Sequence, residues 1–303
     1  MPEINEIRKY ADFIRDKLKN QNIIDIKILN GRYKKHGPFE KYKTIKNKLP
    51  LKLIDVKTKG KFLYMIFEED FFIFSTLGLS GGWCYLKNGS TKYSFSRIID
   101  DYGITDCTTS SYLKTALNHL NVAFITNKGI LYYYDVLSFG SLKVIEGEKE
   151  LNDKLKKIGP DIMEADTTLE FFKTQITKPR NLDKAIGIVL MDQKTVSGIG
   201  NYLRADILYL SKINPFRKVN KLTDAEIKVI FTNCKILTWG DYDIKQAKKL
   251  KIINKTTKLP VDYDRIFFVY SQEKDINGYK VVKKELYEGS QKRFIYYVPE
   301  VQV

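Results

Sequence analysis

The feature that most constrains the fold is a change in apolar patterning near the middle of the chain. Up to about residue 146, short runs rich in β-branched and aromatic residues alternate with Gly, Asn, Lys and Asp. Such runs are typical of strands in an antiparallel sandwich or barrel. The expected strands are 23–29, 51–57, 62–67, 71–76, 83–86, 121–126 and 130–134.

Helical spacing is found on both sides of this strand-rich region. Before it, residues 3–19 carry apolar side chains at positions 4, 7, 11, 14 and 18, which predicts an amphipathic helix. After it, helices are expected over 168–176, 182–190, 201–210 and 224–238. Residues 239–262 are rich in Lys and are expected to be irregular, whereas 265–303 returns to a strand pattern.

A polar linker is expected between the two regions. Residues 147–163 are mostly polar or charged and contain Gly159 followed by Pro160. Domains of roughly 100–200 residues are common, so a chain of this length allows two. The sequence therefore predicts an α+β chain: an N-terminal helix with an antiparallel β-sandwich over 1–146, a linker over 147–163, and a helical domain over 164–303. That last domain is expected to end in a β-hairpin over 265–303.

Composition limits the partners and the surroundings of the chain. The 52 Lys and Arg residues exceed the 36 Asp and Glu residues, which gives a net charge of +16. This excess favours nucleic acid as a partner, while the alternative is a Lys-rich composition with solvated faces. The start lacks the pattern of a signal peptide, and runs such as 71–74 and 130–134 are too short to span a bilayer. We therefore expect an intracellular protein that binds no membrane.

The Cys and His residues are few and scattered. Cys84, Cys107 and Cys234 lie far apart in the sequence, and His36 and His119 are the two histidines. This spacing excludes a disulfide framework and a Cys-based zinc site, and it argues against a His-rich metal site. We expect no metal or cofactor, and a reducing compartment.

The first candidate for chemistry is the start of the chain. Removal of Met1 would expose Pro2 as a secondary amine with a pKa of about 8, which can attack a sugar aldehyde carbon and form an iminium ion. Glu3 and Glu6 follow at the start of the expected helix, where one of them can act as a general acid. The alternative is an ordinary helix start, since Pro and acidic residues are common there.

The second candidate is the turn Gly198-Ile199-Gly200-Asn201, which opens an expected helix. Backbone N–H groups at such a turn can bind a phosphate, and Asn201 can donate its amide to the same anion. The alternative is an ordinary capped turn. The spacing is not that of a dinucleotide fingerprint, because Leu203 stands where a third Gly is needed.

Two single cations complete the candidates. Lys61 stands at the start of an expected strand, from which it can reach a phosphate or a base. Arg293 lies between aromatic residues of the expected hairpin, and an Arg can contact a phosphate with two hydrogen bonds. The alternatives are a solvated strand-end Lys and a surface Arg.

These segments occur in the order found in one family, and the chain resembles the Fpg/Nei DNA glycosylases of the formamidopyrimidine-DNA glycosylase and endonuclease VIII type. The resemblance covers nearly the whole sequence. It rests on MPEINE at 1–6, KGKFL at 59–63, TLGLSGGW at 76–83, HLNVAFITNKGILYYYDVLSFG at 119–140, IGPD at 158–161 and DQKTVSGIGNYLRADILYLSKINP at 192–215. The last of these resembles the helix–two-turn–helix signature of the family, which implies that the helical domain over 164–303 contains this motif.

The resemblance implies a role for each candidate. Pro2 is the nucleophile, Glu3 the general acid and Glu6 a supporting carboxylate, while Lys61 contacts the damaged nucleotide. In the helical part, the turn with Gly198 and Gly200, Asn201 and the finger residue Arg293 hold the DNA backbone. The implied activity is base excision through a Schiff base, followed by β- and δ-elimination. The implied partner is damaged double- or single-stranded DNA, bound by a monomer in the nucleus or another DNA-containing compartment.

Several positions depart from the family pattern. The residues that fill the gap left by a flipped base read Leu79, Leu137 and Phe139, so the usual Arg is absent. Val298 and Val301 stand in place of the last finger Cys pair, which resembles the zincless-finger Nei-like subgroup. In place of zinc, we expect apolar packing by Phe267, Phe268, Val281, Phe294, Tyr296, Val298 and Val301 to hold the hairpin.

Asp206 replaces the usual Glu, a change that we expect to be minor. The zincless-finger resemblance favours oxidised pyrimidines and hydantoins as substrates. The alternatives are an 8-oxoguanine or formamidopyrimidine enzyme of the same family and a non-catalytic DNA-binding relative.

Overall fold

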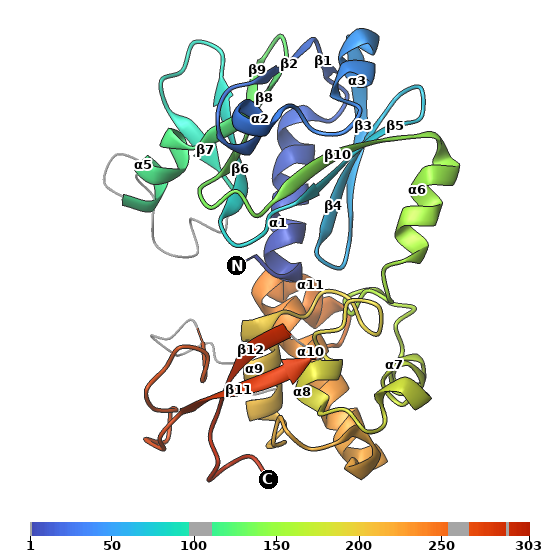
Figure 1. The fold of residues 1–303 in the computed structure, drawn as a ribbon, viewed down its shortest axis with the longest axis vertical. Coiled ribbons are helices and arrows are strands. Elements are labelled where there is room, and N and C mark those ends of the chain that lie inside the picture. The colour runs from blue at the N-terminus through green and yellow to red at the C-terminus, as the bar shows by residue number, and fades with distance from the viewer. Residues whose placement is uncertain (1, 97–110, 254–266, 289–290) are drawn as a thin grey trace. The chain divides into compact units, whose positions relative to one another are not determined.

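The structure is a computed structural model that describes residues 2–96, 111–253, 267–288 and 291–303. The chain divides into two compact units, Met1–Lys156 and Lys157–Val303. The helices of the first unit are α1 (Ile4–Leu18), α2 (Gly31–His36), α3 (Tyr42–Lys48), α5 (Ser111–Asn118) and α6 (Gly147–Lys156) (Figure 1). Its strands are β1 (Asn22–Ile23), β2 (Asp25–Ile28), β3 (Leu51–Lys59), β4 (Phe62–Phe67), β5 (Phe71–Thr76), β6 (Gly81–Lys87), β7 (Tyr93–Phe95), β8 (Leu120–Ile125), β9 (Gly129–Asp135) and β10 (Ser141–Glu146).

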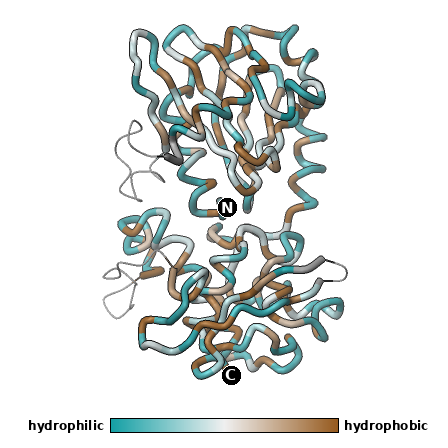
Figure 2. The backbone as a smooth tube through the Cα atoms, turned by 60° about the vertical axis from the view of Figure 1, so that its left-hand side comes forward, coloured by the Kyte–Doolittle hydropathy of each residue, from teal (hydrophilic) through white to brown (hydrophobic). Residues whose placement is uncertain are grey.

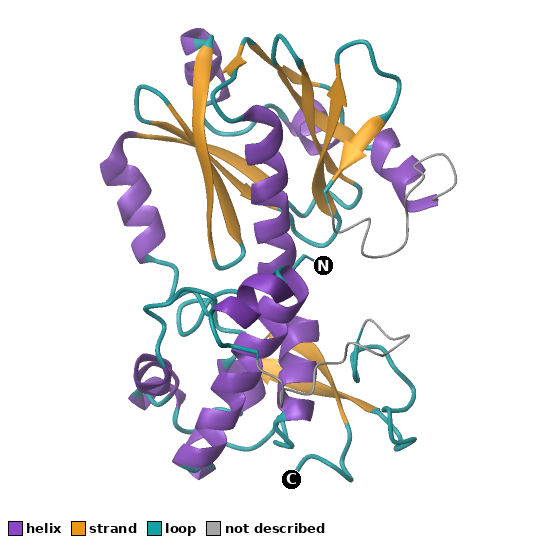
Figure 3. Ribbon diagram, turned by 180° about the vertical axis from the view of Figure 1, so that it is seen from behind, coloured by secondary structure: helices purple, strands orange, loops and turns teal. Residues whose placement is uncertain are grey.

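The strands of the first unit form two antiparallel sheets. Their strand orders are β1-β3-β4-β5-β10 and β2-β8-β9-β6-β7. Helix α1 contacts β3 and β4 of one sheet and β6 of the other, and strands lie on both sides of it (Figure 3). The predicted combination of an N-terminal helix with antiparallel sheets is confirmed.

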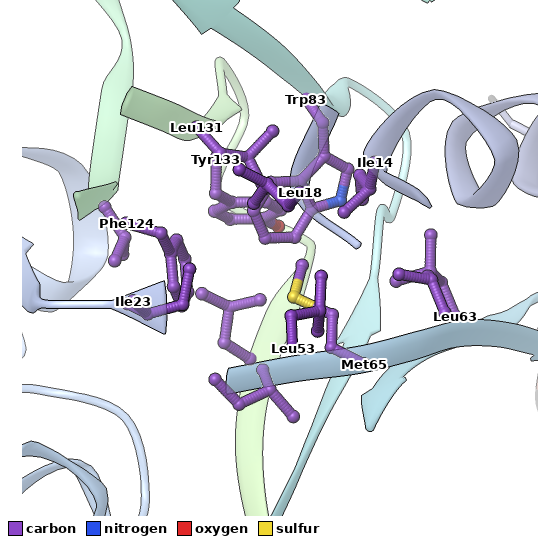
Figure 4. Packing of buried hydrophobic residues seen from close by; sticks show 14 of the residues in the cluster. Ile14, Leu18, Ile23, Leu53, Leu63, Met65, Trp83, Phe124, Leu131 and Tyr133 are labelled. Atoms are coloured by element: carbon purple, nitrogen blue, oxygen red, sulfur yellow. The ribbon is translucent and has the colours of Figure 1, made fainter. Parts of the chain in front are cut away.

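One apolar core fills the space that α1 shares with the two sheets. The buried face of α1 includes Ile7, Ile14 and Leu18, at the helical spacing read from the sequence. These side chains belong to one cluster with Trp83 and Met65, which come from different sheets (Figure 4). Each buried aliphatic side chain contributes about 1.5–3 kcal/mol to folding. The core therefore fixes the position of the first turn of α1, where Glu3 lies.

Two strand predictions differ from the structure. The run 23–29 is interrupted at Ile24, so that β1 joins one sheet and β2 joins the other. Strand β10 was not predicted, because its residues are partly polar, and it forms by pairing with β5 along six residues. The local sequence of β10 favours a strand only weakly, and hydrogen bonding to the edge of an existing sheet stabilises it.

The predicted linker over 147–163 is wrong in its first part. Residues Gly147–Lys156 form helix α6 and belong to the first unit. Leu151 and Leu155, one helical turn apart, pack against the aromatic cluster around Tyr64 and Phe72. Two apolar residues at the right spacing are enough to dock a helix that is otherwise polar.

The second unit is mainly helical and contains one hairpin. Its helices are α7 (Leu169–Ile176), α8 (Ile186–Val189), α9 (Asn201–Leu210), α10 (Asp224–Tyr242) and α11 (Ile244–Lys249), with short 3₁₀ turns at Pro179–Asn181 and Val219–Lys221. Strands β11 (Val282–Glu288) and β12 (Gln291–Tyr297) pair antiparallel. The helix predicted over 182–190 is thus limited to Ile186–Val189.

The region predicted to be irregular, 239–262, is helical in its first part. Helix α10 continues to Tyr242, and Asp243 then caps α11 by accepting the backbone N–H of Gln246 at 2.9 Å. Ala247 of α11 is buried, so this helix packs against the rest of its unit. The remainder, 254–262, lies outside the described residues.

Hydrophilic and hydrophobic residues alternate at short intervals along the backbone of each unit (Figure 2). Within the described ranges, no helix combines the length and the apolar character that crossing a membrane requires.

Cys84 and Cys234 are buried free thiols, and burial raises the pKa of each well above the usual value. Cys107 lies outside the described residues.

Candidate functional site

The start of α1 places two carboxylates beside Pro2. Glu3 is the N-cap of α1, and a capping box links it to Glu6 in both directions: the Glu3 carboxylate accepts the backbone N–H of Glu6, and the Glu6 carboxylate accepts the N–H of Glu3 at 2.5 Å. Glu3 is fully buried, while Pro2 is half-buried. The cap therefore fixes one carboxylate directly next to the candidate amine. Met1 lies outside the described residues.

Lys61 lies in the turn between β3 and β4 rather than within a strand. Gly60, which precedes it, has φ +55°, the left-handed backbone that favours glycine at a tight hairpin turn. Lys61 is half-buried, because it stands at the end of the sheet and not on its apolar face.

Leu79, Leu137 and Phe139 come together on two neighbouring loops. Gly78, at φ +57°, lies so close to Phe139 that an added Cβ would stand 2.6 Å from the Phe139 carbonyl carbon. The three side chains are exposed by 46%, 53% and 63%, respectively. Large apolar side chains with this exposure, grouped at loop tips, suit insertion into an apolar or stacked partner.

Asp135 holds the two loops together. Its carboxylate accepts a hydrogen bond from the Ser80 hydroxyl at 2.7 Å and another from the Gly140 N–H at 2.7 Å. The Ser80 hydroxyl oxygen in turn accepts the N–H of Leu137 at 2.8 Å. Burial, aided by the nearby Asp135 carboxylate, raises the pKa of Tyr133 well above its usual value, so this phenol stays neutral.

Arg32 is a site residue that the sequence reasoning missed. From α2 it donates to the carbonyl oxygen of Gly140, the residue after Phe139, at 3.1 Å. The Arg32 side chain remains exposed. No local pattern marks it, because the contact joins positions more than a hundred residues apart. A cation therefore accompanies the apolar loop tips, although Leu137 itself carries no charge.

In the second unit, the turn at 198–200 is closed by Gln193. The Gln193 amide oxygen accepts the N–H of Gly198 at 3.0 Å, and its amide nitrogen donates to the carbonyl of Ile199 at 2.8 Å. Gly198 has φ +112°, a backbone that non-glycine residues avoid. Its N–H is donated within the turn, so Gly198 shapes the turn, and its contact with a phosphate stays a prediction.

Gly200 and Asn201 lie where the sequence predicted, at the start of α9. Gly200 is the N-cap of this helix and Asn201 its first residue. The Asn201 side-chain oxygen accepts a hydrogen bond from the guanidinium of Arg204. This contact leaves the amide NH₂ as the end that can donate to an anion at the helix N-terminus.

Arg293 lies on β12 opposite Leu286, near the turn of the hairpin. Its side chain is exposed and has no hydrogen-bond or ion-pair partner within the ranges that the structure describes. The predicted apolar packing of the hairpin is correct for Phe268, Val281 and Val298. Tyr296 and Val301 are partly buried and pack against the same cluster, as predicted. The prediction is wrong for Phe294, which is 38% exposed.

The segment around 267–270 is not the predicted strand. The Asp206 carboxylate, which is buried, accepts the backbone N–H groups of Phe268, Val269 and Tyr270 at 3.0–3.3 Å. These bonds replace the ladder bonds of a strand and tie the segment to α9. The Asp206 carboxylate therefore anchors this segment of the C-terminal region to α9, although its side chain is one methylene shorter than that of the usual Glu.

The chain matches two models of known protein families. The formamidopyrimidine-DNA glycosylase N-terminal domain matches residues 1–142, and the formamidopyrimidine-DNA glycosylase H2TH domain matches residues 158–240. The formamidopyrimidine-DNA glycosylase of Ligilactobacillus salivarius is 29% identical over 235 residues, which cover 77% of this chain and 74% of that protein. Endonuclease 8 of Salmonella arizonae is 26% identical over 231 residues, covering 76% and 75%.

Among solved structures, the chain is similar to Lactococcus lactis Fpg non-covalently bound to DNA that contains an AP site. The TM-score is 0.73 at 20% identity, with 99% of each chain covered. The fold and the matched domains define a DNA glycosylase, a DNA-binding enzyme of base excision repair. Within that class, the chain belongs to the Fpg/Nei family, as its motifs indicated.

Proposed function

We propose that this chain is a bifunctional DNA glycosylase and AP lyase that removes oxidised pyrimidines and hydantoins. The observation that carries the proposal is the buried Glu3, fixed by its capping box beside Pro2. An amine and a carboxyl group held side by side are what imine chemistry at a sugar carbon requires. We further propose that the protein acts as a monomer in a DNA-containing compartment.

The proposed reaction proceeds in three steps. The Pro2 nitrogen forms a bond to C1′ of the damaged nucleotide, the glycosidic bond breaks, and the base leaves with the bonding electron pair and a proton. Glu3 donates a proton to the sugar ring oxygen as the ring opens, which leaves an iminium ion. The iminium acidifies the C2′ proton, so its removal expels the 3′ phosphate by β-elimination, and δ-elimination then expels the 5′ phosphate.

The apolar loop tips support a weak dependence on the base opposite the lesion. Position 137 is an exposed Leu, so the loop that carries it has no guanidinium there to bind the base opposite the lesion. A bidentate contact to a base is worth about 1–3 kcal/mol of discrimination, so we expect excision rates within about tenfold across the four opposite bases. Cleavage of thymine glycol, hydantoin and 8-oxoguanine duplexes, each with four opposite bases, measures this.

The matched variant for that assay is Leu137→Arg, which restores a guanidinium on the same loop. We expect it to increase the dependence on the opposite base. Bubble and single-stranded substrates should also be cleaved by the unaltered protein, because unstacking costs least there. A strong preference for 8-oxoguanine opposite C would favour the alternative 8-oxoguanine or formamidopyrimidine activity.

DNA binding should depend steeply on salt. Arg293 is exposed on the hairpin, and the chain carries a net charge of +16. Each neutralised phosphate adds about 0.9 to the slope of log affinity against log salt, so Arg293→Ala should lower that slope by about one. Lys228→Ala, which removes an exposed charge from α10, is the control and should leave the slope unchanged. A flat salt response of the unaltered protein would contradict an electrostatic contact with the backbone.

We propose that the β11–β12 hairpin works as a finger without metal. Within the described ranges, no group of three or more His, Cys, Asp or Glu side chains could hold a metal ion. Val298 is fully buried beneath the hairpin, so Val298→Asp places a carboxylate in an apolar site, which costs several kcal/mol and should loosen the hairpin. We expect a clear fall in melting temperature and in DNA affinity.

The control is Val303→Asp, which makes the same change at a residue that is 76% exposed and should affect neither quantity. Addition of a chelator should also change neither the melting temperature nor the activity of the unaltered protein. Inactivation by the chelator would show that a metal holds the finger, and the proposal of a metal-free hairpin would then be wrong.

A further inference from the structure

Arg204 of α9 is an unusual residue for the interior of the second unit. Its side chain is only 1% exposed, although a guanidinium stays charged at any physiological pH. A buried charge persists only when its hydrogen-bond partners are in place. Identifying those partners therefore shows what the residue holds together.

The partners of Arg204 lie on three separate segments. Its Nη1 donates to the carbonyl oxygen of Gly187 on α8 at 3.0 Å. Its Nη2 donates to the side-chain oxygen of Asn201 and to the carbonyl oxygen of Phe294 on β12, the latter at 2.9 Å. One nitrogen thus joins the start of α9 to the hairpin.

Both of these contacts touch the proposed DNA grip. Arg204 binds the Asn201 side-chain oxygen, so the amide NH₂ remains available to donate a hydrogen bond to an anionic phosphate. Phe294 directly follows Arg293, and neighbouring Cα atoms are about 3.8 Å apart, so fixing the Phe294 carbonyl fixes the backbone from which Arg293 extends.

Other contacts between α9 and the C-terminal region do not make this link. Asp206 binds the backbone at 268–270, and the Tyr209 hydroxyl donates to Asp275 at 2.9 Å. An aromatic chain from Tyr202 through Tyr270 to Tyr296 adds packing between α9 and β12. Arg204 bonds both to Asn201 and to the neighbour of Arg293.

We propose that Arg204 is a positioning residue that couples Asn201 and Arg293, so that the two grip the DNA backbone as one unit. This inference rests on the proposed function, because it takes both residues as phosphate contacts. It implies that disturbing one contact weakens the other through the shared guanidinium.

A double-variant cycle tests the coupling without altering Arg204. Binding of a duplex with a tetrahydrofuran abasic analogue is measured for Asn201→Ala, Arg293→Ala and the double variant. If each single change weakens binding about tenfold, independent contacts predict about a hundredfold loss for the double variant, whereas coupled contacts predict about thirtyfold or less. A hundredfold loss would overturn the proposal.

Removal of the link gives a second test. Arg204→Met keeps much of the side-chain length and loses all three hydrogen bonds. We expect the salt slope of binding to fall by about one, because the charged contact of Arg293 weakens, and the affinity to fall further, because the neutral contact of Asn201 weakens as well. If this variant does not fold, Arg204→Lys takes its place, and a fall in the slope is again expected. A lower melting temperature with an unchanged slope would assign Arg204 a purely structural role and refute the coupling.

The matched control is Arg217→Met in the same unit. The Arg217 guanidinium binds both carboxylate oxygens of Glu226, at 2.7 and 3.0 Å, and lowers the pKa of Glu226 to about 2. Loss of this pair should lower the melting temperature and leave the salt slope unchanged. A fall in the slope as large as that of Arg204→Met would contradict the specific role of Arg204.

Hydrogen exchange without DNA separates this inference from the proposed function. Asn201→Ala should speed the exchange of the β12 amides by at least about threefold, because the guanidinium loses a partner that orients it. Unchanged exchange would overturn the coupling. Faster exchange together with undiminished DNA affinity of both single variants would uphold the coupling and overturn the proposed DNA contacts.

Discussion

Protein whose chain begins at Pro2 is expected to become covalently attached to an AP-site duplex in the presence of borohydride, whereas protein that retains Met1 is expected to give no covalent product. The amine of an N-terminal proline can form an iminium ion with C1′, and borohydride reduces that ion to a stable amine. An acylated Pro2 nitrogen has no lone pair available for attack. Gel separation of the protein–DNA product measures the difference, and mass spectrometry establishes which N-terminus is present.

Two variants identify the nitrogen involved. Pro2→Gly keeps a terminal amine and should retain residual trapping. Lys61→Arg keeps a positive charge at the β3–β4 turn and removes the other candidate amine, so it should still be trapped. Loss of trapping in Lys61→Arg with undiminished DNA binding would make Lys61 the nucleophile. Absence of any trapped product from Pro2-initiated protein would favour a non-catalytic DNA-binding relative.

The parts of the fold that the sequence predicted best are those with strong local periodicity. Helix α1 and strands β4 and β5 have bounds within a residue or so of the predicted ones, since their apolar residues repeat at the period of the element. Helix α6 and strand β10 were missed, because each is stabilised by packing or pairing with β5 and its neighbours and not by its own pattern. Long-range partners of this kind leave no local signal.

The candidate site shows the same division. The sequence pointed to Glu3 and Asn201, because motifs at the helix starts mark them. It did not reveal that Glu3 is fully buried, that Gln193 takes up the N–H of Gly198, or that Arg204 binds Asn201. Each of these facts depends on which side chain fills a given space after folding. The exposure of Phe294 was missed for the same reason, since both faces of β12 carry aromatic residues.

Glu3→Gln is expected to lower base excision by at least ~10²-fold while leaving much of the AP lyase activity, since general acid catalysis typically contributes 10²–10⁴-fold. The glutamine oxygen can still accept the N–H of Glu6, so the cap of α1 and the position of Pro2 are kept. Only the transferable proton is lost. Excision of a damaged base and cleavage of a preformed AP site, measured on matched duplexes, separate the two steps, because the preformed site has no base left to expel.

Glu170→Gln is the matched control, because it makes the same change at an exposed acid in the first turn of α7 and should leave both activities unaltered. Glu6→Gln tests the supporting carboxylate, which bonds to the backbone N–H of Glu3, and should have a smaller effect than Glu3→Gln. If Glu3→Gln reduced both steps equally, Glu3 would organise the whole site and would not act as the proton donor. The lyase step is therefore the measurement that assigns its role, since the ring-opened aldehyde of an AP site reacts with the Pro2 amine and needs no proton delivered to the ring oxygen.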